Sequence, residues 1–196
     1  MNTVLTETTD AGEVPVDVYQ KLASDRILFI NDFIDDNLAT DIVATLMLKD
    51  SEDDKKITLF INSAGGNIRN VFMIYDMMML VESPIETVCL GSAMDEVSML
   101  LSAGTKGMRF ATKNSVISVG QLVHDSMSYS DLTDAKSRLD LSVSDNKRMM
   151  EVFSKTTGKP YKQIFSDFKN TTFMNCNQAM KYGLIDKVVS IKKGKF

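Results

Sequence analysis

Short apolar runs alternate with amphipathic helical segments through the first half of the chain. Three runs have the length and flanking turns of buried strands: residues 26–30, 57–61 and 85–90. Three segments with helical spacing of apolar residues follow them: a helix capped by Asn37 and ending near Lys49, a helix over 68–81, and a helix beginning near Asp95. This alternation predicts βαβ units and a largely parallel sheet with helices on its faces.

The rest of the pattern predicts smaller elements around this sheet. We expect short strands at 108–111, 116–119 and 187–189, and short helices at 15–23, 160–168 and 177–182. The charged stretch 51–56 is predicted to be a loop. Residues 1–14 are polar and lack periodicity, so we interpret them as a flexible N-terminal arm. The sequence thus predicts a single domain over residues 15–196, preceded by that arm.

A long helix from Asp131 to about Thr156 has a narrow apolar stripe on an otherwise charged surface. The stripe consists of Leu132, Ala135, Leu139, Val143, Met150 and Phe153. A narrow stripe on a long helix favours packing against another chain. The alternative is an amphipathic helix that lies on its own domain.

The composition is that of an ordinary soluble globular protein, with 44% hydrophobic and 24% charged residues among 196. A net charge of −4 gives no reason to expect nucleic acid or an anionic membrane as a partner. Cys89 and Cys176 lie far apart and outside any C-x-x-C motif, which favours free buried thiols over a disulfide or a metal site. The chain has no P-loop, and we predict no cofactor.

The cytoplasm is the predicted compartment. No apolar run approaches the roughly 18 residues needed to span a bilayer. Residues 1–18 contain neither the basic start of a secretory signal nor the arginines of a transit peptide. Both observations favour a protein that stays where it is synthesised.

Two glycine-containing turns follow the second and third predicted strands. The first is Asn62-Ser63-Ala64-Gly65-Gly66-Asn67, and the second extends from Gly91 to Gly104. The second turn joins a strand to a helix and should present one side chain, that of Asp95, to a cleft. A carboxylate there lies near a helix N-terminus, where free N–H groups and the helix dipole stabilise it.

Several short motifs occur in order along almost the whole chain. They are Asp25-Arg26-Ile27, Ile34-Asp35-Asp36, Ile61 to Gly66, Ile74-Tyr75-Asp76, Gly104 to Ala111, Phe173-Met174 and Ala179 to Asp186. In that order and spacing they resemble the ClpP family, the peptidase subunits of ATP-dependent Clp proteases. The resemblance implies the ClpP/crotonase fold of the α/β class, a βαβ-type parallel sheet with a projecting handle helix. It also implies a heptameric ring, an AAA+ unfoldase partner and unfolded polypeptide as substrate.

The resemblance also locates the family's Ser-His-Asp triad, and all three positions differ in this chain. The family's G-M-A-A-S-M-G turn aligns with residues 91–97 and puts Asp95 in place of serine. Its N-S-R-V-M-I-H-Q segment puts Gly120 in place of histidine, and its R-D-x-F motif puts Thr171 in place of aspartate. A serine needs a positioned base, and loss of either from such a triad costs on the order of 10⁶ in turnover. We therefore predict that no catalytic residue is intact.

An oxyanion hole has a counterpart in this alignment. The resemblance implies that its backbone donors come from the Gly65-Gly66 turn and from Glu96, the residue after the nucleophile position. We hypothesise that the carboxylate of Asp95 partly fills this hole or blocks it electrostatically.

These features predict a non-catalytic, ClpR-type subunit that joins catalytic ClpP subunits, or copies of itself, in a ring and shapes the chamber, the pore or the chaperone-docking surface. One alternative is an active endopeptidase with a displaced Ser98–His124 pair. Another is a crotonase-like acyl-thioester enzyme that uses Asp95 or Glu96. A further alternative is an inert homo-oligomer that competes for the chaperone.

Overall fold

The computed structural model describes residues 4–9, 12–122 and 132–189. Its centre is a sheet of seven strands, namely β3 (Ile27–Ile30), β4 (Ile57–Ser63), β5 (Ile85–Ala93), β6 (Arg109–Thr112), β7 (Val116–Val119), β8 (Thr172–Asn175) and β9 (Lys187–Val189). The strand order is β3-β4-β5-β6-β9, and β7 pairs with the end of β5 and with β8. Every pairing is parallel except that of β7 with β8. The predicted α/β class with a parallel βαβ-type sheet is confirmed.

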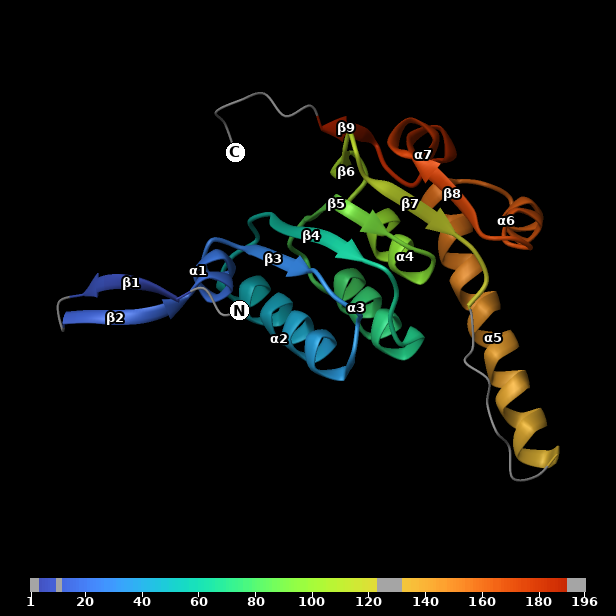
Figure 1. The fold of residues 1–196 in the computed structure, drawn as a ribbon, viewed down its shortest axis with the longest axis horizontal. Coiled ribbons are helices and arrows are strands. Elements are labelled where there is room, and N and C mark those ends of the chain that lie inside the picture. The colour runs from blue at the N-terminus through green and yellow to red at the C-terminus, as the bar shows by residue number, and fades with distance from the viewer. Residues whose placement is uncertain (1–3, 10–11, 123–131, 190–196) are drawn as a thin grey trace.

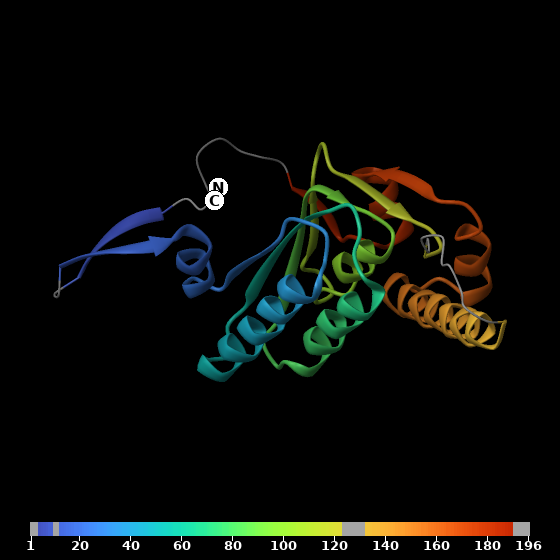
Figure 2. The ribbon, with the colours of Figure 1, turned by 60° about the horizontal axis from the view of Figure 1, so that its bottom comes forward.

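Helices cover this sheet and extend beyond one end of it. They are α1 (Val18–Ser24), α2 (Asp36–Glu52), α3 (Ile68–Leu80), α4 (Glu96–Ser102), α5 (Leu132–Thr157), α6 (Tyr161–Asp167) and α7 (Cys176–Tyr182). Figures 1 and 2 show α2 and α3 side by side on one face of the sheet, and α5 at the end of the molecule opposite the N-terminal strands. The helices that connect β3, β4 and β5 are therefore the crossovers expected between parallel strands.

The core lies between the sheet and these helices. Ile30, Leu59 and Ile61 from the strands, and Leu46 and Ile74 from α2 and α3, are completely buried. Burying one such side chain contributes about 1.5–3 kcal/mol. Alternating residues of β4 point into this core, which is why Ile57, Leu59 and Ile61 read as an apolar strand in the sequence.

The N-terminal segment differs from the predicted arm. Within it the structure describes two antiparallel strands, β1 (Val4–Thr9) and β2 (Gly12–Asp17), which project away from the domain (Figure 1). The many β-branched Val and Thr residues of this segment favour strands, and we underestimated that signal. The helix predicted from Pro15 begins only at Val18, because Asp17 caps it through the backbone N–H of Tyr19 and Pro15 lies in β2.

Both ends of α2 and the presence of one strand differ from the sequence prediction. Helix α2 is capped by Asp35, whose carboxylate accepts from the N–H of Leu38, and not by Asn37. The same helix continues to Glu52, into the stretch predicted as a loop. Strand β8 was not predicted, because only Met174 of its four residues is buried and the strand depends on its pairing with β7. The other predicted strands and helices are present within a few residues of their predicted bounds.

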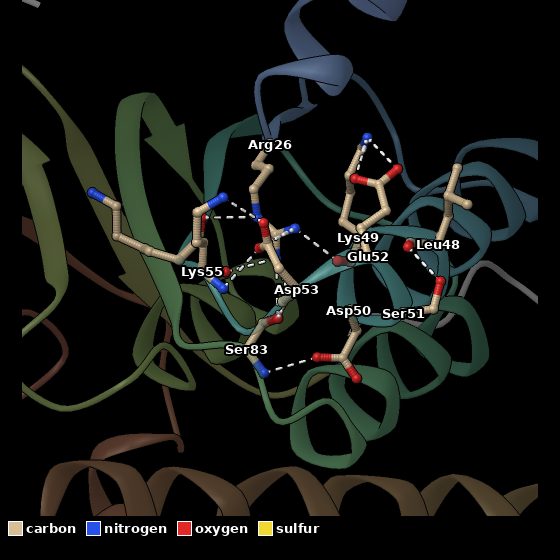
Figure 3. A network of polar contacts seen from close by, with 10 residues as sticks. Arg26, Leu48, Lys49, Asp50, Ser51, Glu52, Asp53, Lys55 and Ser83 are labelled. Carbon is tan, nitrogen blue, oxygen red and sulfur yellow. Dashed lines mark hydrogen bonds and ion pairs between the residues drawn. The ribbon is translucent and has the colours of Figure 1, made fainter.

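Arg26 fixes the junction between α2 and the strands β3 and β4. Its φ of 63° lies in the left-handed region, and its side chain is buried. The guanidinium donates to the carbonyl oxygens of Lys49 (2.7 Å) and Lys55 (2.6 Å) and to Oγ of Ser83 (3.0 Å), and it pairs with the Asp53 carboxylate (Figure 3). One buried cation thus satisfies the Lys49 carbonyl, which the end of α2 leaves without a helical partner, and the Lys55 carbonyl beyond the helix.

Helix α5 is buried at one end and exposed at the other. Met149, Met150 and Phe153, in its second half, belong to the core. Leu139 and Val143 of the predicted apolar stripe, in the first half of the helix, are each 61% exposed. Figure 1 shows that α5 extends beyond the sheet. The second half of the stripe therefore packs on its own domain, as the alternative interpretation predicted, and packing of the first half against another chain stays a prediction.

In the described ranges, none of the helices is both long enough and apolar enough to cross a membrane.

Candidate active site and its residues

The turn between β5 and α4 places Asp95 at a strained position. Asp95 has φ 44° and ψ −109°, outside the regions that non-glycine residues favour. The strain is maintained because Val97, Met99 and Leu100 of the following helix are completely buried. Many hydrolases expose a nucleophile at the end of a sheet by means of a strained strand-to-helix turn of this kind. Here the residue that it presents is an aspartate.

The Asp95 side chain is held by Ser118 of β7. The Ser118 hydroxyl donates to Oδ1 of Asp95 at 2.9 Å, and the backbone N–H of Asp95 donates to the same hydroxyl oxygen at 3.0 Å. Ser118 is completely buried. Ser118 was not among the predicted site residues. The available signal was its hydroxyl within the otherwise apolar strand β7. The two residues close a ring of hydrogen bonds that fixes the Asp95 carboxylate.

The three positions aligned with the triad lie together. A methyl group placed on Gly120 would be 3.1 Å from Oδ1 of Asp95 and 2.8 Å from Oγ1 of Thr171. Gly120 follows β7, and Thr171 immediately precedes β8, its antiparallel neighbour. The fold thus brings Asp95, Gly120 and Thr171 to one point, in the order that a nucleophile, a base and an orienting group would need.

The glycine turn after β4 contacts Glu96, the residue that follows Asp95. The backbone N–H of Gly66 donates to Oε1 of Glu96 at 2.7 Å. A methyl group on Gly65 would lie 3.1 Å from the same oxygen. The Glu96 side chain thus joins the two segments whose backbones the resemblance assigns to an oxyanion hole, and the carboxylate that reaches the turn belongs to Glu96. The Asp95 carboxylate, which we expected there, bonds to Ser118 instead.

The Glu96 carboxyl is in an unusual environment. Burial raises its pKa, its own backbone N–H and that of Gly66 lower it, and the neighbouring Asp95 charge raises it again, with a net increase. Two adjacent carboxyl groups thus bond to different segments, Glu96 to the Gly65-Gly66 turn and Asp95 to β7, and the like charges repel. The resemblance to the family implied a role only for the Glu96 backbone, and the Glu96 carboxylate was considered only for the crotonase-like alternative. The acidic residue in place of the family's methionine was the available signal for a contact by the side chain.

The alternative nucleophile Ser98 is not accessible to a substrate. It is completely buried in α4, and its hydroxyl donates to the carbonyl oxygen of Asp95 at 2.8 Å. Its suggested partner, His124, lies outside the described residues. The geometry therefore provides no support for a displaced Ser98–His124 pair.

Cys89 and Cys176 are free and buried, as predicted from their spacing. Burial raises the pKa of the Cys89 thiol to about 12, so it stays protonated at neutral pH. Among the residues that the structure describes, no group of three or more His, Cys, Asp or Glu side chains is placed to hold a metal ion.

Comparison with known proteins agrees with this geometry. The family model described as Clp protease matches residues 10–192. A curated relative, the ATP-dependent Clp protease proteolytic subunit of Carsonella ruddii (strain PV), is 36% identical over 180 residues, which is 91% of this chain and 91% of the relative. A family match over nearly the whole chain, together with a site at the positions where that family carries its catalytic residues, leads to one conclusion: the chain belongs to the Clp protease family.

Proposed function

We propose that this chain is a non-catalytic, ClpR-type subunit of an ATP-dependent Clp protease complex. The observation that carries this proposal is Asp95 at the strained turn, with Oδ1 held 2.9 Å from the buried Ser118 hydroxyl. The position that should offer a nucleophile instead offers a fixed carboxylate. Its neighbours Gly120 and Thr171 contain no group that can accept and return a proton at neutral pH.

The chemistry of peptide hydrolysis supports this proposal. Attack on an amide needs an activated nucleophile, a base that becomes the acid for the leaving amine, and donors for the oxyanion. Glycine at 120 provides no base. The Gly66 N–H, which would be one of the donors, is already engaged by Glu96. Each of the three requirements is therefore unmet by the described residues around Asp95.

The Ser118–Asp95 contact is the one serine–carboxylate pair that we find within this site. It does not favour an active enzyme, because Ser118 is completely buried and its oxygen already accepts a hydrogen bond from the backbone of Asp95. A substrate carbonyl has no approach to it. Ser118 nevertheless provides a useful control in the assay below.

A role in assembly accounts for the retained fold. Family membership supports a ring built with catalytic Clp subunits, with copies of this chain, or with both, which passes unfolded polypeptide received from an AAA+ unfoldase. The exposed part of the α5 stripe, with Leu139 and Val143, is an apolar surface suited to packing between subunits. In this role the chain contributes the walls and surfaces of the chamber, and its partners contribute the hydrolysis.

The first experiment measures hydrolysis of a fluorogenic peptide by the purified chain, with its oligomeric state determined and host Clp peptidase removed. We expect no turnover above background. Hydrolysis that persists in Asp95→Ala but is lost in Ser98→Ala or Ser118→Ala would overturn the proposal. Co-expression with a catalytic family subunit then tests assembly: the two chains should copurify in one ring, and separate rings would contradict the mixed complex.

A further inference from the structure

The environment of Glu96 shows a second feature of the site, separate from the missing nucleophile. Oε1 of Glu96 accepts from the Gly66 N–H at 2.7 Å, across thirty positions of sequence. The side chain is half-buried rather than extended into solvent, as an acidic residue in the first turn of a helix usually is. Its carboxylate therefore lies against the Gly65-Gly66 turn.

The Gly65-Gly66 turn that Glu96 contacts is fixed by its own backbone contacts with Ile34. The N–H of Ile34 donates to the carbonyl of Gly65 at 3.1 Å, and the N–H of Asn67 donates to the carbonyl of Ile34 at 3.0 Å. A methyl group on Gly66 would lie 2.5 Å from Cβ of Ile34, so the two segments are in close backbone contact. Because this turn cannot easily withdraw, the position in front of its N–H is available only if the Glu96 side chain moves.

We propose that Glu96 is an internal plug, whose carboxylate occupies the position that an acyl oxygen would take and so closes the site to carbonyl groups. The inference rests on the proposed function, because it treats the surroundings of Asp95 and the Gly65-Gly66 turn as a former acyl-transfer site. It adds a second and independent block: restoring the triad alone does not reopen the site. A donor turned toward a developing oxyanion serves catalysis only when that position is empty.

Charge strengthens the block beyond its steric effect. A carboxylate beside the donor places negative charge where negative charge would develop in the transition state, and the nearby Asp95 adds a second negative charge. A charge-assisted hydrogen bond from the Gly66 N–H holds the plug in place. An incoming neutral carbonyl would have to replace the stronger acceptor with a weaker one.

The contact itself is tested by amide hydrogen exchange at Gly66. The variants are Glu96→Met, which introduces the residue of the family motif, and Glu96→Gln, which keeps an acceptor oxygen. Glu151→Gln is the matched control, since that carboxyl is exposed on α5. We expect Gly66 exchange to accelerate at least 10-fold in Glu96→Met, less in Glu96→Gln and not at all in Glu151→Gln. Unchanged exchange in Glu96→Met would overturn the proposal.

The functional block is tested in a restored background. The variant Asp95→Ser/Gly120→His/Thr171→Asp is compared with and without Glu96→Met, by the rate of labelling with a peptidyl fluorophosphonate. Since losing one oxyanion donor costs about 10²–10³ in rate, we expect labelling at least 100-fold faster with Glu96→Met. Equal measurable rates would overturn the proposal, and if neither background is labelled the Gly66 exchange result decides. Activity of the natural chain would refute the proposed function without changing the exchange result.

Discussion

Arg109 and Asp186 form a bidentate ion pair, with Nη2 of the arginine 2.7 Å from Oδ1 and Nε 2.9 Å from Oδ2. The remaining Nη1 donates to three carbonyl oxygens, those of Ser102, Thr156 and Gly183, at 3.0–3.1 Å. These carbonyls lie at the C-terminal ends of α4, α5 and α7, where helices leave acceptors without partners. A single guanidinium thus joins three helix ends to strand β6, and α4 is the helix that positions Asp95.

Removing the carboxylate of this pair should destabilise the whole domain. Asp186→Asn leaves the Arg109 charge buried without its counter-ion, and breaking a buried pair in this way costs about 3–5 kcal/mol. Urea denaturation at neutral pH measures this loss. A loss below about 1 kcal/mol would show that the pair is solvated and does not organise the helix ends. Glu151→Gln, on the exposed surface, provides the control.

The same variant has a defined pH dependence. Hydrogen bonding from Arg109 lowers the pKa of Asp186 below its ordinary value of 3.8. A lowered folded-state pKa gives stability that is present above the ordinary value and lost as pH falls through the folded value. The difference between the natural chain and Asp186→Asn should therefore be constant near neutral pH and shrink only below about pH 4. A difference that changes between pH 6 and 8 would contradict this assignment.

The second buried arginine, Arg26, should contribute to the stability of the domain about as much as the Arg109–Asp186 pair does. Arg26→Ala removes bonds to the carbonyls of Lys49 and Lys55 and to Ser83 (Figure 3), and we expect a loss of about 3 kcal/mol, at roughly 1 kcal/mol for each bond. Arg26→Lys should recover little, because one ammonium cannot reach these separated acceptors. The control is Lys55→Ala, whose side chain is 77% exposed and should change stability by less than about 0.5 kcal/mol. Equal effects of Arg26→Ala and Lys55→Ala in urea denaturation would refute the prediction.

The close approach of Gly66 to Ile34 predicts a specific intolerance. In Gly66→Ala the new methyl would lie 2.5 Å from Cβ and 3.1 Å from Cα of Ile34, and overpacking of this kind costs about 1–3 kcal/mol. Gly158→Ala is the comparison: its methyl meets no atom within 4 Å, and only its φ of +74° opposes the change, at roughly 1 kcal/mol. Gly66→Ala should unfold at a lower temperature than Gly158→Ala. The reverse order would mean that the Gly65-Gly66 turn can move away from Ile34.

The sheet and its helices were predictable because their signals are local. The apolar runs of β3, β4 and β5 and the helical spacing of α2 and α3 follow directly from residue order. Strand β8 was not predictable in this way, because its mostly exposed residues form a strand only through pairing with β7. The N-terminal hairpin was missed for a related reason: its polar Thr residues contribute strand propensity without an apolar alternation.

The site was predictable in position but not in detail. The resemblance to the ClpP family aligned Asp95, Gly120 and Thr171 with one triad, and the structure brings them together. Spacing alone could not decide which of two adjacent carboxylates reaches Gly66, since that depends on the side-chain direction imposed by the strained turn. Once Asp95 is oriented toward Ser118, Glu96 is the residue left facing the Gly65-Gly66 turn. The chemistry of a site thus depends on rotations that sequence patterns do not specify.

The raised pKa of Glu96 predicts how stability responds to pH. A folded-state pKa above the ordinary value means that the charged form is disfavoured in the fold, so the natural chain should gain stability as pH falls from neutral through that pKa. Glu96→Gln has no charge to bury, so it should be the more stable chain at neutral pH. The advantage should shrink as pH falls toward the ordinary glutamate pKa, as measured by urea denaturation at several pH values. An advantage that grows on acidification would mean that the Gly66 hydrogen bond outweighs burial, and Glu151→Gln should show no comparable trend.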